Sequence, residues 1–161
     1  MITSNLTILK YDMITLRKYN AEDCDSVSKL FYETIHCINA KDYTEAQLSA
    51  WAKDCDALKS RQNDLLEQVA IVAEIDGITV GFGSINKTGY LDLLYVHKSF
   101  QRQGIATALC DELELGFSVV TTHASVTAKP FFEKRGYIVI KSQQVERFGV
   151  KLKNYVMQKT V

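Results

Sequence analysis

Apolar and polar positions alternate along this chain with two different periods, which predict strands and helices in a definite order. Strands are predicted at 13–17, where apolar and polar residues alternate, and at six runs rich in β-formers between turns: 68–74, 78–85, 90–96, 117–123, 137–140 and 150–157. Helices with a period near 3.6 are predicted from Asn20 to Ile38, from Thr44 onward, over 102–116, and from Ser125 or Thr127 to Gly136. The weakest pattern lies in 36–66, where 56–66 fits either a further helix or an ordered loop.

Cap and turn residues support several of these boundaries. Asn20 is expected to cap the first helix, and Thr44 to open the second through a capping box with Gln47. Asp76-Gly77 is typical of a hairpin turn, so the three central strands should form an antiparallel meander. The strands on either side of the 102–116 helix should be parallel neighbours with a right-handed crossover. The pattern therefore predicts an α/β (α+β) fold with a mixed sheet.

Composition narrows the class of protein. The 161 residues contain one proline and are expected to form a single domain, 1–161, with 1–12 as an irregular N-terminal arm. Lys+Arg and Asp+Glu both number 19, which argues against nucleic acid or an anionic membrane as a partner. The first residues lack a signal-peptide pattern. The four cysteines lack zinc spacing, so we expect free thiols in a cytoplasmic protein without a metal site.

The strongest chemical signal lies between Val96 and Thr107, where a strand ends, the chain turns and a helix begins. We expect Arg102, Gln103 and Gly104 in the first turn of that helix. The N–H groups of a first turn lack intrahelical partners and carry partial positive charge, so they attract anions. Gly104 would let a phosphate approach the backbone without meeting a Cβ atom.

These residues also carry a resemblance. Gln101-x-x-Gly104-x-Ala106 after a strand resembles the pyrophosphate-binding motif of the GNAT superfamily of acyl-CoA-dependent N-acetyltransferases. The stretch 128–137, Ala-Lys-Pro-Phe-Phe-Glu-Lys-Arg-Gly-Tyr, resembles the second CoA-binding motif of that family, with Phe132 where a tyrosine is usual. The order of elements from Met13 to the C-terminus resembles the GNAT order. It implies a mostly antiparallel sheet whose fourth and fifth strands splay apart around acyl-CoA, flanked by helices.

The resemblance implies acetyl-CoA as co-substrate and an amine as acceptor, with no metal. It assigns CoA binding to Leu94, Tyr95, Val96, Gln101, Arg102, Gln103, Gly104, Ile105, Ala106, Thr107, Ser125, Phe131 and Phe132. The family's tyrosine protonates the leaving thiolate, and Phe132 cannot donate a proton. Tyr155 is our first candidate for a replacement acid, and Tyr137 and His123 are further candidates.

Direct attack by an amine on the thioester also needs a base and a donor for the oxyanion. Asp92, on the same strand as the expected oxyanion donor near Leu94, is our first candidate for the base, and Glu146 and His36 are further candidates. A structural partner of a cation is an equally good interpretation of the Asp92 carboxylate. Tyr32, His36 and Tyr43 are the expected acceptor-binding residues, although aromatic residues at helical spacing are also typical of a core.

Two functions are therefore open. The first is an N-acetyltransferase that acts on a small molecule or a peptide. The second, motivated by Phe132, is a non-catalytic acyl-CoA-binding sensor or scaffold. A nucleotide-binding α/β domain has little support, because the chain lacks both Gly-Lys-Ser/Thr after the turn and G-x-G-x-x-G. Pairing of a second copy along the last strand, which would give a homodimer, stays open.

Overall fold

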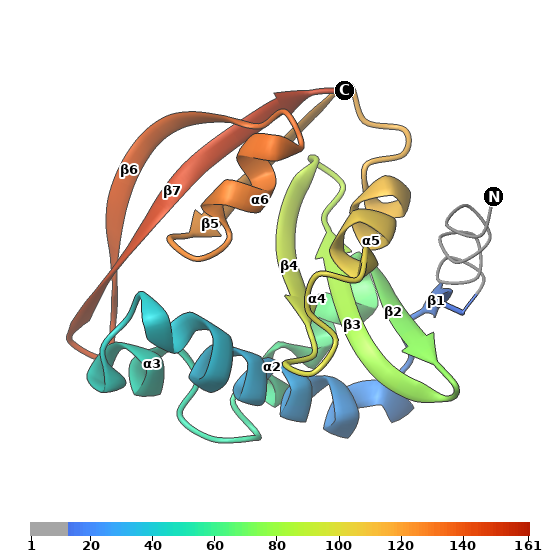
Figure 1. Ribbon diagram of the computed structural model, residues 1–161, viewed down its shortest axis with the longest axis horizontal. Helices are drawn as coiled ribbons and strands as arrows, with labels where there is room; N and C mark the ends of the chain where they lie inside the picture. Colours follow the sequence, from blue (N-terminus) through green and yellow to red (C-terminus); the bar gives the residue numbers. More distant parts are fainter. Residues whose placement is uncertain (1–12) are drawn as a thin grey trace, which may run out of the picture.

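The computed structural model describes residues 13–161, so the arm expected at 1–12 lies outside the described residues (Figure 1). The strands are β1 (Thr15–Lys18), β2 (Val69–Ile75), β3 (Ile78–Ile85), β4 (Tyr90–Val96), β5 (Val119–Ser125), β6 (Ile138–Arg147) and β7 (Val150–Thr160). The α-helices are α2 (Cys24–Ile38), α3 (Glu45–Trp51), α4 (Gln62–Glu67), α5 (Ile105–Leu113) and α6 (Lys129–Lys134). Short 3-10 helices are η1 (Ala21–Asp23), η2 (Asn39–Lys41) and η3 (Lys59–Arg61). Within the described chain, no helix is long and apolar enough to span a membrane.

The strands form one sheet in the order β1-β2-β3-β4-β5-β7-β6. Neighbouring strands are antiparallel except for β4 and β5, which are parallel and joined through α5. The predicted meander of β2, β3 and β4 and the predicted parallel pair are confirmed. The sequence also left open whether 56–66 holds a helix, and the structure places η3 and the start of α4 there.

The sheet is nearly divided between β4 and β5. These strands pair only at Tyr90–Thr121 and Leu91–Thr122, and the Thr122 hydroxyl donates a 2.9 Å bond to the Leu91 carbonyl. Beyond Leu91, β4 pairs only with β3, while β5 continues beside β7 as far as Ser125. The expected splay of the fourth and fifth strands is confirmed, and the two halves part in Figure 1.

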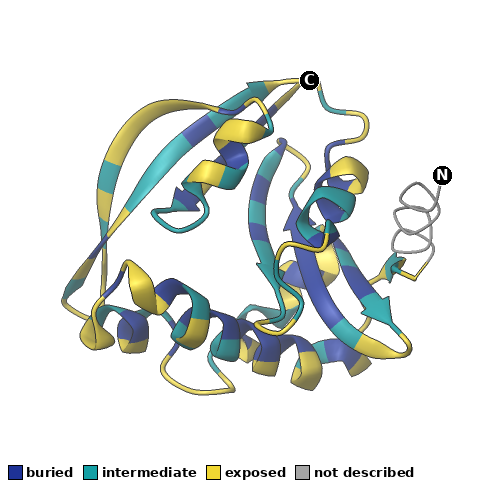
Figure 2. Ribbon diagram, viewed as in Figure 1, coloured by how far each residue is buried: buried dark blue, intermediate teal, exposed yellow. Residues whose placement is uncertain are grey.

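Helices cover both faces of the sheet, and each face has its own apolar core. One core joins α2 and α3 to β3 and β4; we call this side the α2 face, defined by Phe31, Ile35, Leu48, Phe82 and Leu93. The other joins α5 and α6 to the sheet; we call this side the α5 face, defined by Ile105, Leu109, Phe132, Leu91 and Met157. The buried stripes of α2, α5 and the central strands are visible in Figure 2.

Two glycines of β3 allow α5 to lie close to the sheet. A Cβ atom at Gly81 would stand 2.8 Å from Cγ2 of Ile105, and one at Gly83 would stand 2.7 Å from Cδ1 of Leu113. Contacts this short are repulsive, so a larger residue at either position would push α5 outward. The position of the N-terminus of α5 therefore depends on Gly81 and Gly83.

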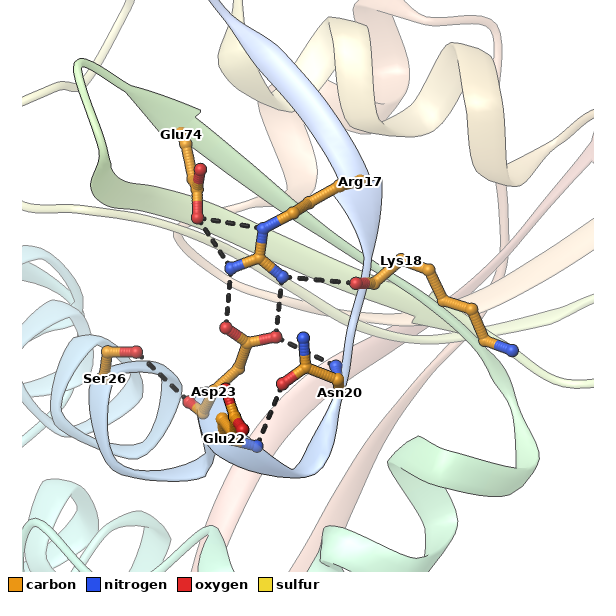
Figure 3. Close-up of polar contacts among 7 residues, drawn as sticks. All are labelled: Arg17, Lys18, Asn20, Glu22, Asp23, Ser26 and Glu74. Atoms are coloured by element: carbon orange, nitrogen blue, oxygen red, sulfur yellow. Dashed lines mark hydrogen bonds and ion pairs between the residues drawn. The ribbon is translucent and has the colours of Figure 1, made fainter.

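Arg17 connects β1 to β2 and to the start of α2 (Figure 3). Its guanidinium donates to both carboxylate oxygens of Asp23, at 2.8 and 2.6 Å, and to Glu74 on β2, at 2.9 and 2.6 Å. These hydrogen bonds lower the pKa of Asp23 below its usual value. Asn20 caps this end as predicted, since its side chain accepts the Glu22 N–H. Thr44 and Gln47 likewise form the predicted capping box.

Several predicted boundaries are wrong. The strand predicted at 137–140 is β6, which continues to Arg147 because it pairs with β7 along that whole length, and the helix predicted to reach Gly136 ends at Lys134. The helix predicted over 102–116 begins at Ile105, because Arg102 and Gly104 have φ values of 59° and 83°, which a right-handed helix excludes. Arg102, Gln103 and Gly104 therefore approach the helix and do not form its first turn. The strand predicted at 117–123 runs from Val119 to Ser125, because α5 is followed by Gly116 with φ 84° and a further turn.

A buried carboxylate joins the two halves of the sheet on the α5 face. Glu114, at the end of α5, is 4% exposed and accepts hydrogen bonds from Arg135 Nε (2.7 Å), the Tyr137 hydroxyl (3.0 Å) and Lys159 Nζ (3.1 Å). Burial raises the pKa of Glu114, but the bonds from Arg135 and Lys159 outweigh it and lower the pKa overall. This arrangement commits the Tyr137 hydroxyl to Glu114, so Tyr137 is a core residue.

We expect Glu114→Gln to lower the free energy of unfolding by about 3 kcal/mol at pH 7, because it leaves Arg135 and Lys159 without their buried counter-charge. The pKa of Glu114 is lower in the folded protein than in the unfolded chain, where a glutamate has a pKa of about 4.3. Its contribution to stability is therefore complete above about pH 4.3 and is lost as the pH falls through the pKa of the folded protein. The difference in free energy of unfolding between wild type and variant, measured with urea, should therefore shrink below about pH 4.

Asp111→Asn is the control, because Asp111 also pairs with Arg135 but is 61% exposed. The control should cost less than about 1 kcal/mol; equal costs would contradict the assignment.

Candidate functional site

The turn between β4 and α5 is closed by bonds to the end of β4. The Gln101 side chain donates a 2.7 Å bond to the Val96 carbonyl, and Thr34 of α2 donates to the same oxygen at 3.0 Å. The N–H of His97 donates to Val80 of β3 at 2.8 Å. Gln101, expected among the CoA-binding residues, thus uses its amide nitrogen to shape the turn.

The N-terminus of α5 leaves its first N–H groups free. The first intrahelical bond runs from the Ala108 N–H to the Gly104 carbonyl, at 3.0 Å. No described residue caps the helix with its side chain or accepts from the N–H groups of Ile105, Ala106 or Thr107. A Cβ atom built on Gly104 would have no atom within 4 Å, so the space in front of this turn is open. Free N–H groups, the helix dipole and open space together make an anion-binding site.

The second expected CoA-binding stretch lies on α6, next to the end of β5. The helix expected to start at Ser125 or Thr127 begins only at Lys129, after Ala128, and no side chain caps it. The Ser125 hydroxyl accepts the Ala128 N–H at 3.0 Å in the turn that leads into the helix. Phe131 is partly exposed, whereas Phe132 is 3% exposed. The Phe132 ring stands edge-on to Phe131 and to Tyr137, with centroids 5.2 and 4.9 Å away. Phe132 therefore belongs mainly to the core of the α5 face.

Tyr155, the candidate acid, lies on β7 opposite Ala124 of β5. Its partly buried ring packs in the same apolar cluster as Ala128 and Phe131. The ammonium groups of Lys129 and Lys153 lie 5.1 and 5.3 Å from its centroid. The Tyr155 side chain thus lies beside the first turn of α6, with two positively charged lysine side chains near its ring.

Asp92, the candidate base, occupies a bulge in β4. Ser84 pairs with Leu93 and Ile85 with Leu91, so Asp92 is the extra residue between them. Its Oδ2 atom accepts bonds from the Arg61 guanidinium and, at 3.0 Å, from Gln68. Its Oδ1 atom accepts no hydrogen bond from any described residue, and 13% of the side chain is exposed. One oxygen is therefore anchored, and the other is available.

Of the three expected acceptor-binding residues, Tyr32 and His36 lie side by side on α2, whereas Tyr43 precedes α3 and contacts the second half of the sheet. The Tyr32 and His36 rings have centroids 4.3 Å apart, and His36 Nε2 lies 2.7 Å from the Ala52 carbonyl. The Tyr43 hydroxyl donates to the Lys153 carbonyl (2.6 Å) and accepts the Val126 N–H (2.9 Å). The polar atoms of His36 and Tyr43 thus connect the helices to each other and to β7.

Sequence reasoning missed the residues around Asp92. Arg61, on η3, holds Asp92 across 31 positions of the chain. Tyr90 lies against His123, with ring centroids 5.0 Å apart, and the charges of Arg61 and Arg147 both act on the Tyr90 phenol. Burial and the charge of Lys141 lower the pKa of His123. These contacts bring together residues that are distant in the sequence, so no local pattern could have indicated them.

Comparisons with known proteins agree with this geometry. Residues 39–159 match the model of the acetyltransferase (GNAT) domain. The uncharacterized N-acetyltransferase YafP of Escherichia coli K12 is 34% identical over 146 residues, 90% of this chain and 95% of the relative. The crystal structure of a GCN5-related N-acetyltransferase from Rhodopseudomonas palustris superposes with a TM-score of 0.87 at 34% identity, over 91% of this chain and 95% of that one.

A third relative was solved with a ligand. The PaiA N-acetyltransferase of Thermoplasma acidophilum, in complex with coenzyme A, superposes with a TM-score of 0.73 at 18% identity, over 92% of this chain and 99% of that one. At that identity the likeness concerns the fold. The family model and the two relatives at 34% identity show more: this chain belongs to the GNAT family of N-acetyltransferases, acyltransferases that transfer groups other than amino-acyl groups.

Proposed function

We propose that this protein transfers the acetyl group of acetyl-CoA to an amine by direct attack, without an acetyl-enzyme intermediate. The observation that carries the proposal is the open N-terminus of α5 beside the unpaired edge of β4. The free N–H groups at Ile105, Ala106 and Thr107 would bind the pyrophosphate, with Arg102 adding charge. That PaiA holds coenzyme A on the same fold supports this assignment.

The pantetheine would lie along β4. Beyond Leu91 this strand has no neighbour on the side of β5, so its backbone can bond an extended ligand as a further strand would. In this placement the thioester reaches the middle of β4. A backbone N–H at Leu94, Tyr95 or Val96 would then stabilise the oxyanion. Phe131 would contribute apolar surface from α6, whereas Phe132, with 3% of its surface exposed, has almost none to offer.

Asp92 and Tyr155 are the proposed base and acid. The free Oδ1 of Asp92 would take the proton of the attacking amine, directly or through water, while Arg61 and Gln68 hold Oδ2. Tyr155 would protonate the leaving thiolate from the other half of the sheet. A thiol has a pKa near 8.5, so this acid assists departure of CoA without being indispensable.

The proposed pyrophosphate-binding site can be tested with Gly104→Glu, which we expect to abolish acetyl-CoA binding. The new carboxylate would occupy the open space in front of α5 and repel phosphate. Gly116→Glu is a matched control, because Gly116 ends the same helix with φ 84° and equally open surroundings. Both variants carry similar backbone strain of about 1 kcal/mol. Calorimetric titration with acetyl-CoA and with ADP should show loss of binding only for Gly104→Glu; binding retained by a folded Gly104→Glu protein would refute the assignment.

Asp92→Asn tests the base. We expect kcat to fall by about 100-fold or more, because the amide cannot accept the amine's proton. Arg61→Gln breaks the same ion pair but leaves the carboxylate in place, so its kcat should fall much less. Thermal unfolding of both variants measures the structural part of the effect. If the two variants lost equal activity and equal stability, Asp92 would be only a partner of Arg61.

Tyr155→Phe tests the acid and removes one hydroxyl from an otherwise unchanged ring. We expect kcat to fall by about 10-fold with the KM for acetyl-CoA unchanged, a modest loss because CoA is a tolerable leaving group. The loss should be smaller with an acyl donor whose thiol is more acidic. An unchanged kcat would mean that solvent, not Tyr155, protonates the leaving thiolate.

Tight acetyl-CoA binding without any amine-dependent release of CoA would instead favour the sensor or scaffold function.

A further inference from the structure

Two polar residues stand at the point where β4 and β5 begin to separate. Leu91 and Thr122 are the last pair between the two strands, so Asp92 and His123 are the first residues beyond it, one on each strand. Paired strands lie about 4.8 Å apart, and the two backbones diverge from that spacing. Asp92 and His123 therefore occupy the narrow end of the opening between the strands, on opposite sides of it.

Contacts fix the face on which these side chains lie. Leu91 packs in the core of the α5 face, so its neighbour Tyr90 projects to the α2 face. The His123 ring stands edge-on to the Tyr90 ring, with centroids 5.0 Å apart, which places His123 on the α2 face as well. Arg61 draws Asp92 to the same face, because the segment on either side of Arg61 packs in the core of the α2 face. An imidazole and a carboxylate thus lie on one face at the end of the seam.

His123 differs from the other two histidines of the chain in having both ring nitrogens available. His36 Nε2 lies 2.7 Å from the Ala52 carbonyl, and His97 Nδ1 accepts the Ser99 N–H at 3.0 Å. Within residues 13–161, His123 makes no hydrogen bond, and its side chain is exposed. Its imidazole can therefore take up a proton and release it to solvent without breaking a bond.

The groups around His123 keep its imidazole neutral at pH 7. Its strand neighbour Val156 on β7 is paired in turn with Lys141 on β6, so a positive charge lies in the same row of the sheet. Partial burial and the charge of Lys141 lower the pKa of His123, and they outweigh the opposing charge of Asp92. Burial raises the pKa of Tyr90, so this phenol is neutral too. A neutral imidazole can act as a proton acceptor.

We infer that His123 is a second proton acceptor of the reaction: it takes the proton that converts the bound ammonium into a nucleophile, while Asp92 takes the proton lost as the C–N bond forms. This inference rests on the proposed function. An ordinary imidazole has a pKa about 2.6 higher than an ordinary carboxylate, so it is the better base for an ammonium. The nitrogen of the tetrahedral intermediate is more acidic than a free ammonium, so a carboxylate suffices for the second proton.

The protons balance over one turnover. The amine nitrogen attacks the thioester carbon, the C–S bond breaks, and its electron pair stays on sulfur. Tyr155 protonates the thiolate and recovers a proton, through solvent, from Asp92. His123 releases its proton to solvent, because its side chain is exposed. One ammonium and one acetyl-CoA thus give one amide, one CoA and one proton, and no further reactant is required.

The pH dependence of His123→Ala tests this role. The acceptors are phenethylamine, phenylalaninamide and spermidine, and the acetylated amine is measured by chromatography at saturating acetyl-CoA. The ratio of kcat/KM between wild type and variant cancels the ionisation of the amine itself. We expect this ratio to be about 100 at neutral pH, a usual contribution of a positioned base. It should fall towards 1 below about pH 6, because the wild-type imidazole becomes protonated.

Added imidazole gives a second readout, because the space left by His123→Ala is open to solvent. Imidazole should restore part of the lost rate, after subtraction of its own reaction with acetyl-CoA and the amine. His97→Asn is the control, because it removes another imidazole and keeps an acceptor for the Ser99 N–H. Its ratio to wild type should be the same at every pH, and imidazole should not stimulate it.

Two results would separate this inference from the proposed function. An amine that is acetylated with a wild-type to His123→Ala ratio independent of pH would overturn the inference and leave the function intact. In that case His123 would serve only to pack against Tyr90. Acetyl-CoA binding without acetylation of any of the three amines would overturn the proposed function, and this inference with it.

Discussion

The seam between β4 and β5 consists of two residue pairs and the bond from the Thr122 hydroxyl to the Leu91 carbonyl. A parallel pair this short contributes little by itself, and the edge of β4 beyond it has no strand to satisfy it. The two halves are therefore held mainly by what packs across the seam: α5 against Gly81 and Gly83 on one half, and the buried Glu114 bonded to Arg135 and Lys159 of the other. Because β4 and β5 pair at only two positions, the strands separate beyond Leu91. The packing of α5 and the bonds of Glu114 hold the two halves of the sheet in that arrangement.

The two faces of that opening differ in chemistry, and the difference follows from which helices cover them. On the α5 face, α5 directs free N–H groups into open space while the partly exposed Phe131 supplies apolar surface, a combination suited to a long ligand with a phosphate at one end. On the α2 face, Asp92 stays partly exposed and His123 is exposed. Such a surface suits a small polar molecule. A thioester carbon at the middle of β4 would be reached from both sides, which is the requirement for direct transfer.

Periodicity and caps predicted most of this fold, because helices such as Cys24–Ile38 bury one continuous face. The start of α5 was misjudged because Arg102 and Gln103 are ordinary helix formers, and nothing in their chemistry reveals a positive φ at Arg102. The splay came from family resemblance, since the residues of β4 and β5 do not indicate where pairing stops. The partners of Asp92 were missed for a further reason: Arg61 and Gln68 reach it through folding of the segment with the weakest pattern.

Phe132 stands where the family motif usually has a tyrosine, and its surroundings explain why a phenyl ring fits this position. Its buried ring stands edge-on to Phe131 and Tyr137, and the Tyr137 hydroxyl already donates to Glu114. A hydroxyl added at this position would need a partner of its own, or it would remain unsatisfied in an apolar cluster at a cost of about 1–3 kcal/mol. The phenyl ring thus strengthens the packing that holds α6 against α5. Any protein group that assists the leaving thiolate must then come from a neighbouring strand, where Lys129 and Lys153 already place positive charge beside Tyr155.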